Sequence, residues 1–290
     1  MINFKNLILY RSPFSHLLID DFLDVEIYQD LEKQVRAMFD NFNDLEQGHL
    51  ESPDRYDKSK KRGNNLVFGG GGKDNESTQD IIEASKRFNG PINEIIKEIF
   101  SEKIQNKIYR LLRPVHLLDI GSIKPIKLHD ESKKVGFVDF ILYKNCYVRA
   151  KLSAYTTNSG LFQHIDHPDK VNALLLYLGF SDGVNRKGLG TQIYKVNKGQ
   201  KKWSKNAGYT LDYYEEKKLT RVSDINPVPN RLFGFHKNRF SWHAVYPIDL
   251  PEGVRRDTIQ INLYKHKNYS KILDSLIKSL RYIKNKILIR

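Results

Sequence analysis

The chain contains 290 residues, of which 40% are hydrophobic, and its formal net charge is +14 at pH 7. This length allows one large buried core, and the single cysteine, Cys146, excludes an internal disulfide and a zinc site built from several cysteines. The basic excess favours an anionic partner (nucleic acid, an anionic membrane surface or an acidic substrate), although a lysine-rich composition alone would also account for it. We expect a reducing, cytoplasmic setting, because the sequence shows no secretory leader and no apolar run long enough to cross a bilayer.

The first part of the chain predicts helices on either side of a polar segment. Residues 15–22 suit a short strand or turn, and residues 24–39 have apolar side chains at spacings of three and four, which predicts an amphipathic helix with Asp24 as its N-cap. Residues 81–112 show the same periodicity and predict further helices. Residues 41–80 between them are polar and aperiodic, so we predict a long surface loop that is either disordered or a lid over a site.

The second half of the chain predicts an antiparallel β-fold. Short segments rich in aromatic and β-branched residues follow one another without intervening helices, which favours a sandwich or jelly roll. The predicted strands are residues 137–143, 147–155, 173–180, 192–196, 231–235 and 258–264. The last of these alternates cleanly, so one of its faces should be buried and the other should look into polar surroundings.

The final segment, residues 269–290, predicts a helix with one apolar stripe surrounded by lysine and arginine. Such a helix can pack against the domain. Alternatively, it can rest on an anionic membrane surface, which would make the protein peripheral to the membrane.

Three residues form a candidate metal site. His164 and Asp166 are two apart, so in an extended segment they point to the same side. His243, at the end of a strand-like segment, is the preferred third ligand, ahead of His236 and of His167, which follows Asp166 directly. Two histidines and one carboxylate leave several coordination positions open, which suits non-haem Fe(II).

A basic residue strengthens this interpretation. Arg256 follows His243 by 13 residues and shares a strand face with Thr258, whereas Arg255 takes the other face. A guanidinium matches a carboxylate in bidentate fashion, and a hydroxyl can add a third contact. An arginine in this position suits a dicarboxylate cosubstrate such as 2-oxoglutarate.

From about Tyr147 to Tyr264 the chain resembles the iron(II)- and 2-oxoglutarate-dependent dioxygenases, especially their prolyl-hydroxylase-like branch. The matching segments there, in order, are His164-x-Asp166, Leu174–Leu178, Gly188–Tyr194, Asn230–Phe235, Ser241–His243 and Arg256-x-Thr258. Outside this stretch, Leu17–Asp24 also resembles the family's usual entry into its first helix. Two departures concern the substrate contacts: the family often has Gly-Gly where Leu189-Gly190 stands, and residues 195–230 form an unusually long segment.

The resemblance implies an α+β, mainly β fold, namely a double-stranded β-helix (jelly roll) with supporting N-terminal helices and a C-terminal helix. It implies a single oxygenase domain over residues 1–268. Residues 1–118 would supply helical support and the polar loop, residues 119–268 the jelly-roll core, and residues 269–290 the basic amphipathic helix.

The resemblance also implies an activity and its cofactors. The protein would hydroxylate a C–H of a peptidyl, amino-acid or glycan substrate with the help of Fe(II), 2-oxoglutarate and O2. In this reaction 2-oxoglutarate would be converted to succinate and CO2. Ascorbate is a further candidate cofactor. Related halogenases lack the carboxylate ligand of the metal, whereas this chain has Asp166 at that position, so hydroxylation is favoured over halogenation. Tyr155 would bind the 2-oxoglutarate carboxylate and Tyr177 would line the same pocket, although each could equally be a core aromatic.

Two other classes of function stay open. The same histidines and aspartate could hold zinc in a metal-dependent hydrolase, but Arg256 would then have no purpose. A non-catalytic jelly-roll binding protein is the third hypothesis. Nucleic acid is disfavoured as its ligand, because the sequence lacks a motif that interleaves aromatic and basic residues.

Overall fold

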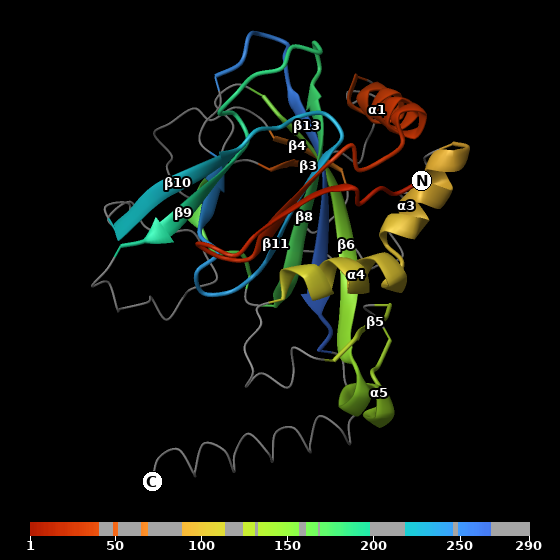
Figure 1. Cartoon of the computed structure of the whole chain (residues 1–290). Coiled ribbons are helices and arrows are strands. Elements are labelled where there is room, and N and C mark those ends of the chain that lie inside the picture. Colours follow the sequence, from red (N-terminus) through yellow and green to blue (C-terminus); the bar gives the residue numbers. More distant parts are fainter. Residues whose placement is uncertain are drawn as a thin grey trace.

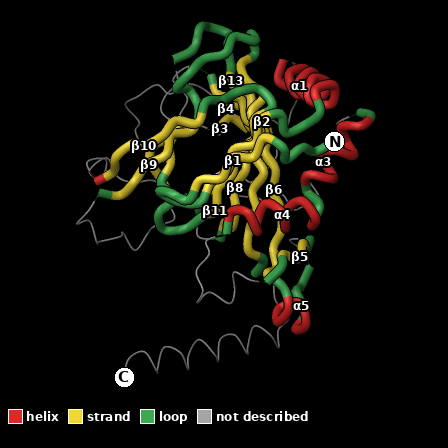
Figure 2. Tube along the Cα trace, viewed as in Figure 1, coloured by secondary structure: helices red, strands yellow, loops and turns green. Residues whose placement is uncertain are grey.

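The computed structural model describes residues 1–40, 49–51, 65–68, 89–113, 124–130, 133–156, 161–167, 169–197, 218–245 and 249–267. Within these residues the protein consists mainly of two β-sheets (Figure 1). Three helices, α1, α3 and α4, lie on one side of the larger sheet, and the strands β9 and β10 of the smaller sheet lie on the other side (Figure 2).

The larger sheet has nine strands within the described residues. Their order is β1-β2-β11-β8-β13-β6-β4-β3, and β5 pairs in parallel with β6. Their bounds are β1 Asn6–Tyr10, β2 His16–Asp20, β3 His49–Glu51, β4 Asn65–Phe68, β5 Ile126–Leu128, β6 Lys144–Tyr155, β8 Lys170–Phe180, β11 Arg231–His236 and β13 Arg256–Lys265.

The smaller sheet has the order β10-β9-β12-β7. It comprises β7 Leu161–His164, β9 Thr191–Val196, β10 Leu219–Ile225 and β12 His243–Val245. From β6 to β13 the chain crosses from one sheet to the other at every connection except β9–β10, which is a hairpin. Eight strands wound in this way form a double-stranded β-helix, so the predicted fold class is confirmed.

Alternation along the strands gives the larger sheet two different faces. On β13, Ile259, Ile261 and Leu263 are buried in the main hydrophobic core, which also contains residues of α1, α3 and α4. We call this the helix face. The residues between them, such as Arg256 and Thr258, point to the opposite side, toward the smaller sheet, and we call this the inner face.

The helices that cover the helix face follow the predicted periodicity. Helix α1 (Val25–Asp40) buries Tyr28, Leu31 and Val35 at spacings of three and four. Helices α3 (Pro91–Ile99) and α4 (Glu102–Leu112) each bury one apolar stripe. Helix α3 has Pro91 as its first residue, where a missing N–H does no harm, and the Ser101 side chain caps α4 by accepting from the Ile104 N–H.

One predicted strand is wrong. Residues 137–143 do not form a strand: Phe137–Leu142 is the short helix α5, which follows Gly136 and buries none of its residues. Their aromatic and β-branched composition suits a strand, but the ladder of β6 begins only at Lys144. Without a neighbouring strand, the backbone N–H of Phe140 donates to the Gly136 carbonyl and that of Tyr143 to the Asp139 carbonyl.

The polar segment 41–80 contains structure that its composition does not indicate. Strands β3 and β4 lie within it and extend the larger sheet beyond β6, so the expectation of a continuous loop is wrong for these short stretches. The rest of the segment, including the predicted lid, lies outside the described residues. The predicted C-terminal helix at 269–290 and the predicted helical residues 81–88 also lie outside them. No helix among the described residues has the length and apolar character needed to span a membrane.

Candidate metal centre and anion anchor

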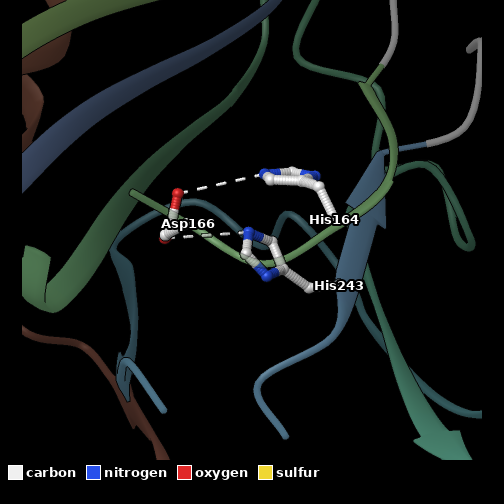
Figure 3. A group of neighbouring side chains, drawn as sticks. All are labelled: His164, Asp166 and His243. Carbon is white, nitrogen blue, oxygen red and sulfur yellow. Dashed lines mark ion pairs between the residues drawn. The ribbon is translucent and has the colours of Figure 1, made fainter. Parts of the chain in front are cut away.

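Two of the three predicted metal ligands come from neighbouring strands of the smaller sheet. His164 is the last residue of β7 and His243 is the first residue of β12, and the antiparallel register places them directly opposite each other. Asp166 follows β7 by two residues. Each of the three side chains offers one ligand atom, and these atoms lie within 4.8 Å of one another (Figure 3). The structure therefore brings together the predicted trio.

The geometry inside the trio suits a cation. Nε2 of His164 is 3.9 Å from Oδ1 of Asp166, and Nε2 of His243 is 3.9 Å from Oδ2. Oδ2 of Asp166 is buried and has no hydrogen-bond partner among the described residues. Buried polar atoms normally have a partner, so this oxygen, which faces an imidazole nitrogen, is the atom that we expect to meet a metal ion.

His243 is held in the state that a metal ligand requires. Its Nδ1–H donates to the Ser241 carbonyl at 2.9 Å, which leaves Nε2 with a lone pair directed at the trio. Burial, together with the neighbouring His164, lowers the pKa of His243 to about 3. The imidazole is therefore neutral at physiological pH.

Lys170 is a functional-site residue that the sequence analysis missed. Its ammonium donates to Oδ1 of Asp166 at 2.8 Å. Burial opposes the charged form of Asp166, but the charge and hydrogen bond of Lys170, together with the two neighbouring histidines, outweigh it and hold the pKa of the carboxyl below its ordinary value. Burial likewise opposes the charge of Lys170, but Asp166 raises the pKa of the ammonium above its usual value. The only sequence signal was the position of Lys170, four residues after Asp166 and immediately before the apolar run of β8.

The donor set fits a divalent transition metal. Two imidazoles and one carboxylate are the protein ligands typical of non-haem Fe(II) centres with open positions. Two of the ligands are fixed by contacts of their own, His243 through Ser241 and Asp166 through Lys170. Such outer contacts orient metal ligands and tune their affinity.

Arg256 is fully buried at the start of β13, on the inner face as predicted. Its guanidinium carbon lies 4.4 Å from the ring centroid of Tyr155, and its Nη1 donates to the Leu189 carbonyl. Its Nε and Nη2 have no hydrogen-bond partner in the described part of the chain. Burial lowers the pKa of Arg256, but a guanidinium stays charged in proteins. A buried cation with two unused donors is unfavourable unless an anion binds it.

The adjacent Arg255 provides an internal contrast. It points to the helix face, where its Nε is 3.1 Å from Oδ1 of the buried Asp257. Thr258 returns to the inner face, and its hydroxyl donates to the Ser153 carbonyl at 3.3 Å. The predicted division of these residues between two faces is therefore correct.

A short path between the two sheets connects the trio to Arg256: it follows β9 of the smaller sheet and then crosses to the inner face of the larger sheet. His243 pairs with Ile193 of β9, and Thr191 lies two residues away on the same side, about 7 Å along the strand. The Thr191 hydroxyl is 2.7 Å from that of Tyr177. Tyr177 is buried and lies within electrostatic range of Arg256, and burial is the main cause of its raised pKa.

Both predicted tyrosines therefore lie beside Arg256. Tyr155 contributes its ring face, and Tyr177 contributes a hydroxyl that is already paired with Thr191. Apolar side chains pack against Tyr155 at this end of the inner face; the cluster consists of Tyr155, Phe180, Val245 and Leu250, with Leu189 and Val254 packed against it.

The two alternative histidines lie elsewhere. His167 is exposed, with its Nδ1 3.8 Å from Oδ2 of Asp169. The Nδ1 of His236 is 3.0 Å from the Asn172 side-chain oxygen, and its ring packs near Tyr109 of α4. Neither belongs to the trio, so the preference for His243 agrees with the geometry.

Comparison with known proteins gives similarity of fold only. No protein-family model matches the sequence, and no curated protein sequence matches it. Solved structures similar to this chain include a prolyl hydroxylase from Trichoplax adhaerens in complex with a hypoxia-inducible-factor peptide, with 14% identity and a TM-score of 0.46 over 87% of this chain and 84% of that one.

Two further structures are similar to a comparable degree. A prolyl-4-hydroxylase from Pseudomonas putida has 12% identity and a TM-score of 0.41 over 86% of this chain and 92% of its own. HygX from Streptomyces hygroscopicus, with nickel and 2-oxoglutarate bound, has 10% identity and a TM-score of 0.41 over 86% and 82%. At these levels the site geometry, and not the similarity, has to support a function.

Proposed function

We propose that the protein is an Fe(II)- and 2-oxoglutarate-dependent dioxygenase. The observation that supports this most strongly is the buried Arg256, whose Nε and Nη2 have no acceptor among the described residues and which lies at one end of a path that leads to His164, Asp166 and His243. A metal trio alone is compatible with several chemistries. A trio joined to a buried, unsatisfied guanidinium calls for a ligand with a metal-binding group at one end and a carboxylate at the other, which describes 2-oxoglutarate.

In this proposal each residue has a defined task. His164, Asp166 and His243 hold the metal through Nε2, Oδ2 and Nε2, respectively. Arg256 binds the far carboxylate of 2-oxoglutarate through Nε and Nη2, while the Thr258 and Tyr177 hydroxyls lie on the same face to complete the contact. When bound, Fe(II) would supply the O2-dependent oxidation of a substrate C–H, coupled to conversion of 2-oxoglutarate to succinate and CO2.

The protein scaffold would contribute position and exclusion of water. The apolar cluster around Arg256 strengthens the interaction of the guanidinium with a carboxylate, because charges attract more strongly away from water. A zinc hydrolase built on the same trio would leave this buried cation without a partner. Hydroxylation of a peptidyl, amino-acid or glycan substrate is our proposal for the finer function, supported by the presence of the carboxylate ligand Asp166.

The anchor role can be tested by anaerobic binding. Fe(II) and 2-oxoglutarate added to the protein should give a weak visible absorption band, and the His164→Ala variant should lose it. Arg256→Gln should keep metal affinity but bind 2-oxoglutarate at least about tenfold more weakly, because charge-assisted hydrogen bonds are lost.

The neighbouring arginine supplies the matched control. Arg255→Gln removes the same charge one residue away, on the helix face, and should change 2-oxoglutarate affinity by less than about threefold. An unaltered band in His164→Ala would refute the metal site. Equal 2-oxoglutarate affinity in the Arg256→Gln variant and the wild-type protein would refute the anchor.

A further inference from the structure

The inner face continues beyond the metal trio as a second charged and aromatic surface. In the register of β6 and β13, Tyr147 lies opposite Tyr264, and Arg149 lies opposite Asn262. Lys170 of β8 pairs with Tyr264 on the other side of β13. We call Tyr147, Arg149, Lys170 and Tyr264 the cationic wall. All four side chains are half-buried.

The members of the cationic wall are packed against one another. The rings of Tyr147 and Tyr264 stack with centroids 5.4 Å apart and an interplanar angle of 14°. The guanidinium carbon of Arg149 lies 5.4 Å from the first ring and 5.6 Å from the second. The Lys170 ammonium lies 5.9 Å from the Tyr264 ring and contacts Asp166. The wall is therefore in direct contact with a metal ligand.

The cationic wall and Arg256 lie on the same face of the larger sheet but far apart along it. Arg256 is the first residue of β13 and Tyr264 is near its last, so the proposed carboxylate anchor and the wall lie toward opposite ends of one strand. A cosubstrate held by Arg256 would fill the side of the trio toward that anchor. A substrate approaching the metal from the other side would meet Lys170 and Arg149.

The charge balance around the metal favours an anionic substrate. The two imidazoles are counted as neutral ligands and Asp166 contributes one negative charge, which Lys170 already balances. A metal dication and Arg256 then add positive charge that a 2-oxoglutarate dianion offsets only in part. Partly buried cations of this kind bind anions strongly because water screens them poorly.

We propose that Lys170 and Arg149 bind an oxyanion of the substrate, a carboxylate or a phosphate, while the stacked tyrosines form the surface beneath it. This inference rests on the proposed function and names the class of its substrate. A guanidinium and an ammonium both donate several hydrogen bonds to oxyanions, and the aromatic pair offers a flat face to the adjoining part of the substrate.

Three fluorinated probes test the proposal without turnover. They are 4-fluorophenyl phosphate, 4-fluorobenzoate and the neutral 4-fluorobenzyl alcohol, each added to the full-length protein that contains Co(II) and saturating 2-oxoglutarate under anaerobic conditions. Fluorine NMR gives the affinity of each probe, and line broadening relative to Zn(II)-loaded protein reports whether the bound probe lies near the metal. Saturation with 2-oxoglutarate keeps the probes away from Arg256.

At least one anionic probe should bind and be broadened by Co(II), and the neutral alcohol should bind at least about tenfold more weakly. The relative affinities of phosphate and benzoate would identify the preferred oxyanion. Arg149→Gln should weaken anionic binding at least about tenfold, and Arg149→Lys should restore part of it. Arg110→Gln, an exposed arginine on α4, is the matched control and should leave probe affinity unchanged.

Lys170→Gln should also weaken anionic binding, but it removes the partner of Asp166 as well and so can disturb metal binding. Arg149→Gln leaves that contact in place and therefore tests the proposal independently of the metal site. Equal binding of the neutral and anionic probes, or equal anionic affinity in Arg149→Gln and wild-type protein, would overturn the substrate class while leaving the proposed function intact. Failure of the wild-type protein to bind metal or 2-oxoglutarate would overturn both.

Discussion

On β13, Ile259, Ile261 and Leu263 point toward the helices, whereas Arg256 and Thr258, on the same strand, point toward the smaller sheet. The helix face is mainly apolar, apart from the Arg255–Asp257 ion pair, and stabilises the fold through burial. Between the sheets, the described residues include a buried guanidinium with two donors and a carboxylate oxygen that have no hydrogen-bond partner there, features that oppose folding unless ligands bind. Alternate residues of β13 thus have different roles: those on one face stabilise the fold, and those on the other face belong to the candidate site.

The largest effect on stability should come from the helix face. Leu176 of β8 is fully buried in the main core, so Leu176→Ala should lower the free energy of unfolding by about 2–4 kcal/mol through lost burial and a residual cavity. Urea denaturation of metal-free protein measures this change. If the two faces are independent, the folded variant should bind Zn(II) with wild-type affinity, and a large loss of affinity would show that they are coupled.

The second prediction uses acid to disturb a polar group near the edge of the core. Burial, reinforced by Lys144, Lys265 and Lys237, lowers the pKa of His236 from 6.5 to about 3. Between these two pKa values the unfolded chain binds a proton at His236 that the folded protein does not. The contribution of neutral His236 to the free energy of unfolding is therefore fully present above pH 6.5 and decreases as the pH falls toward 3. Between pH 7 and pH 4 the loss should reach about 1–3 kcal/mol.

His236→Asn provides the comparison, because its amide can still donate to the Asn172 oxygen that contacts His236 Nδ1. Unfolding free energies measured at several pH values should decline less steeply in this variant than in the wild-type protein. Parallel curves for the two proteins would contradict the assignment of this pH dependence to His236.

The most discriminating prediction, which includes the smallest expected change in stability, compares two adjacent arginines in ligand-free protein. Arg255→Met removes the ion pair with the buried Asp257 and should destabilise the fold by about 1–3 kcal/mol. Arg256→Met removes a buried charge with two unused donors and should change stability by less than about 1 kcal/mol, or increase it.

Thermal denaturation with and without metal and 2-oxoglutarate measures how ligand binding affects the stability of the same two variants. The cosubstrate should raise the melting temperature of Arg255→Met but not that of Arg256→Met, since only a bound ligand shifts the transition. The opposite pattern would mean that the roles of the two faces are reversed.

Much of the candidate site could be predicted from the spacing of residues along single strands. The two-residue step from His164 to Asp166 and the alternation from Arg255 to Thr258 follow from strand geometry, and the structure agrees with both. Lys170 could not be identified in the same way, because its contact with Asp166 depends on how the chain turns between β7 and β8. A lysine before an apolar strand has no distinctive pattern.

The misjudged elements also have physical causes. Phe137–Leu142 has the composition of a strand but no strand beside it, and it forms the helix α5. Strands β3 and β4 show little sequence pattern because neighbouring strands supply their hydrogen bonds: β4 pairs with β6, and β3 pairs with β4. Composition describes a segment, whereas pairing depends on its neighbours.

The strand order has a consequence for biosynthesis. Strand β13 lies between β8 and β6, so during translation the earlier strands wait for residues 256–265 before the larger sheet can close. Until then β6 and β8 present open edges to other chains. All three residues of the trio emerge from the ribosome before Arg256, so under the proposed function the metal ligands are synthesised before the anchor for 2-oxoglutarate.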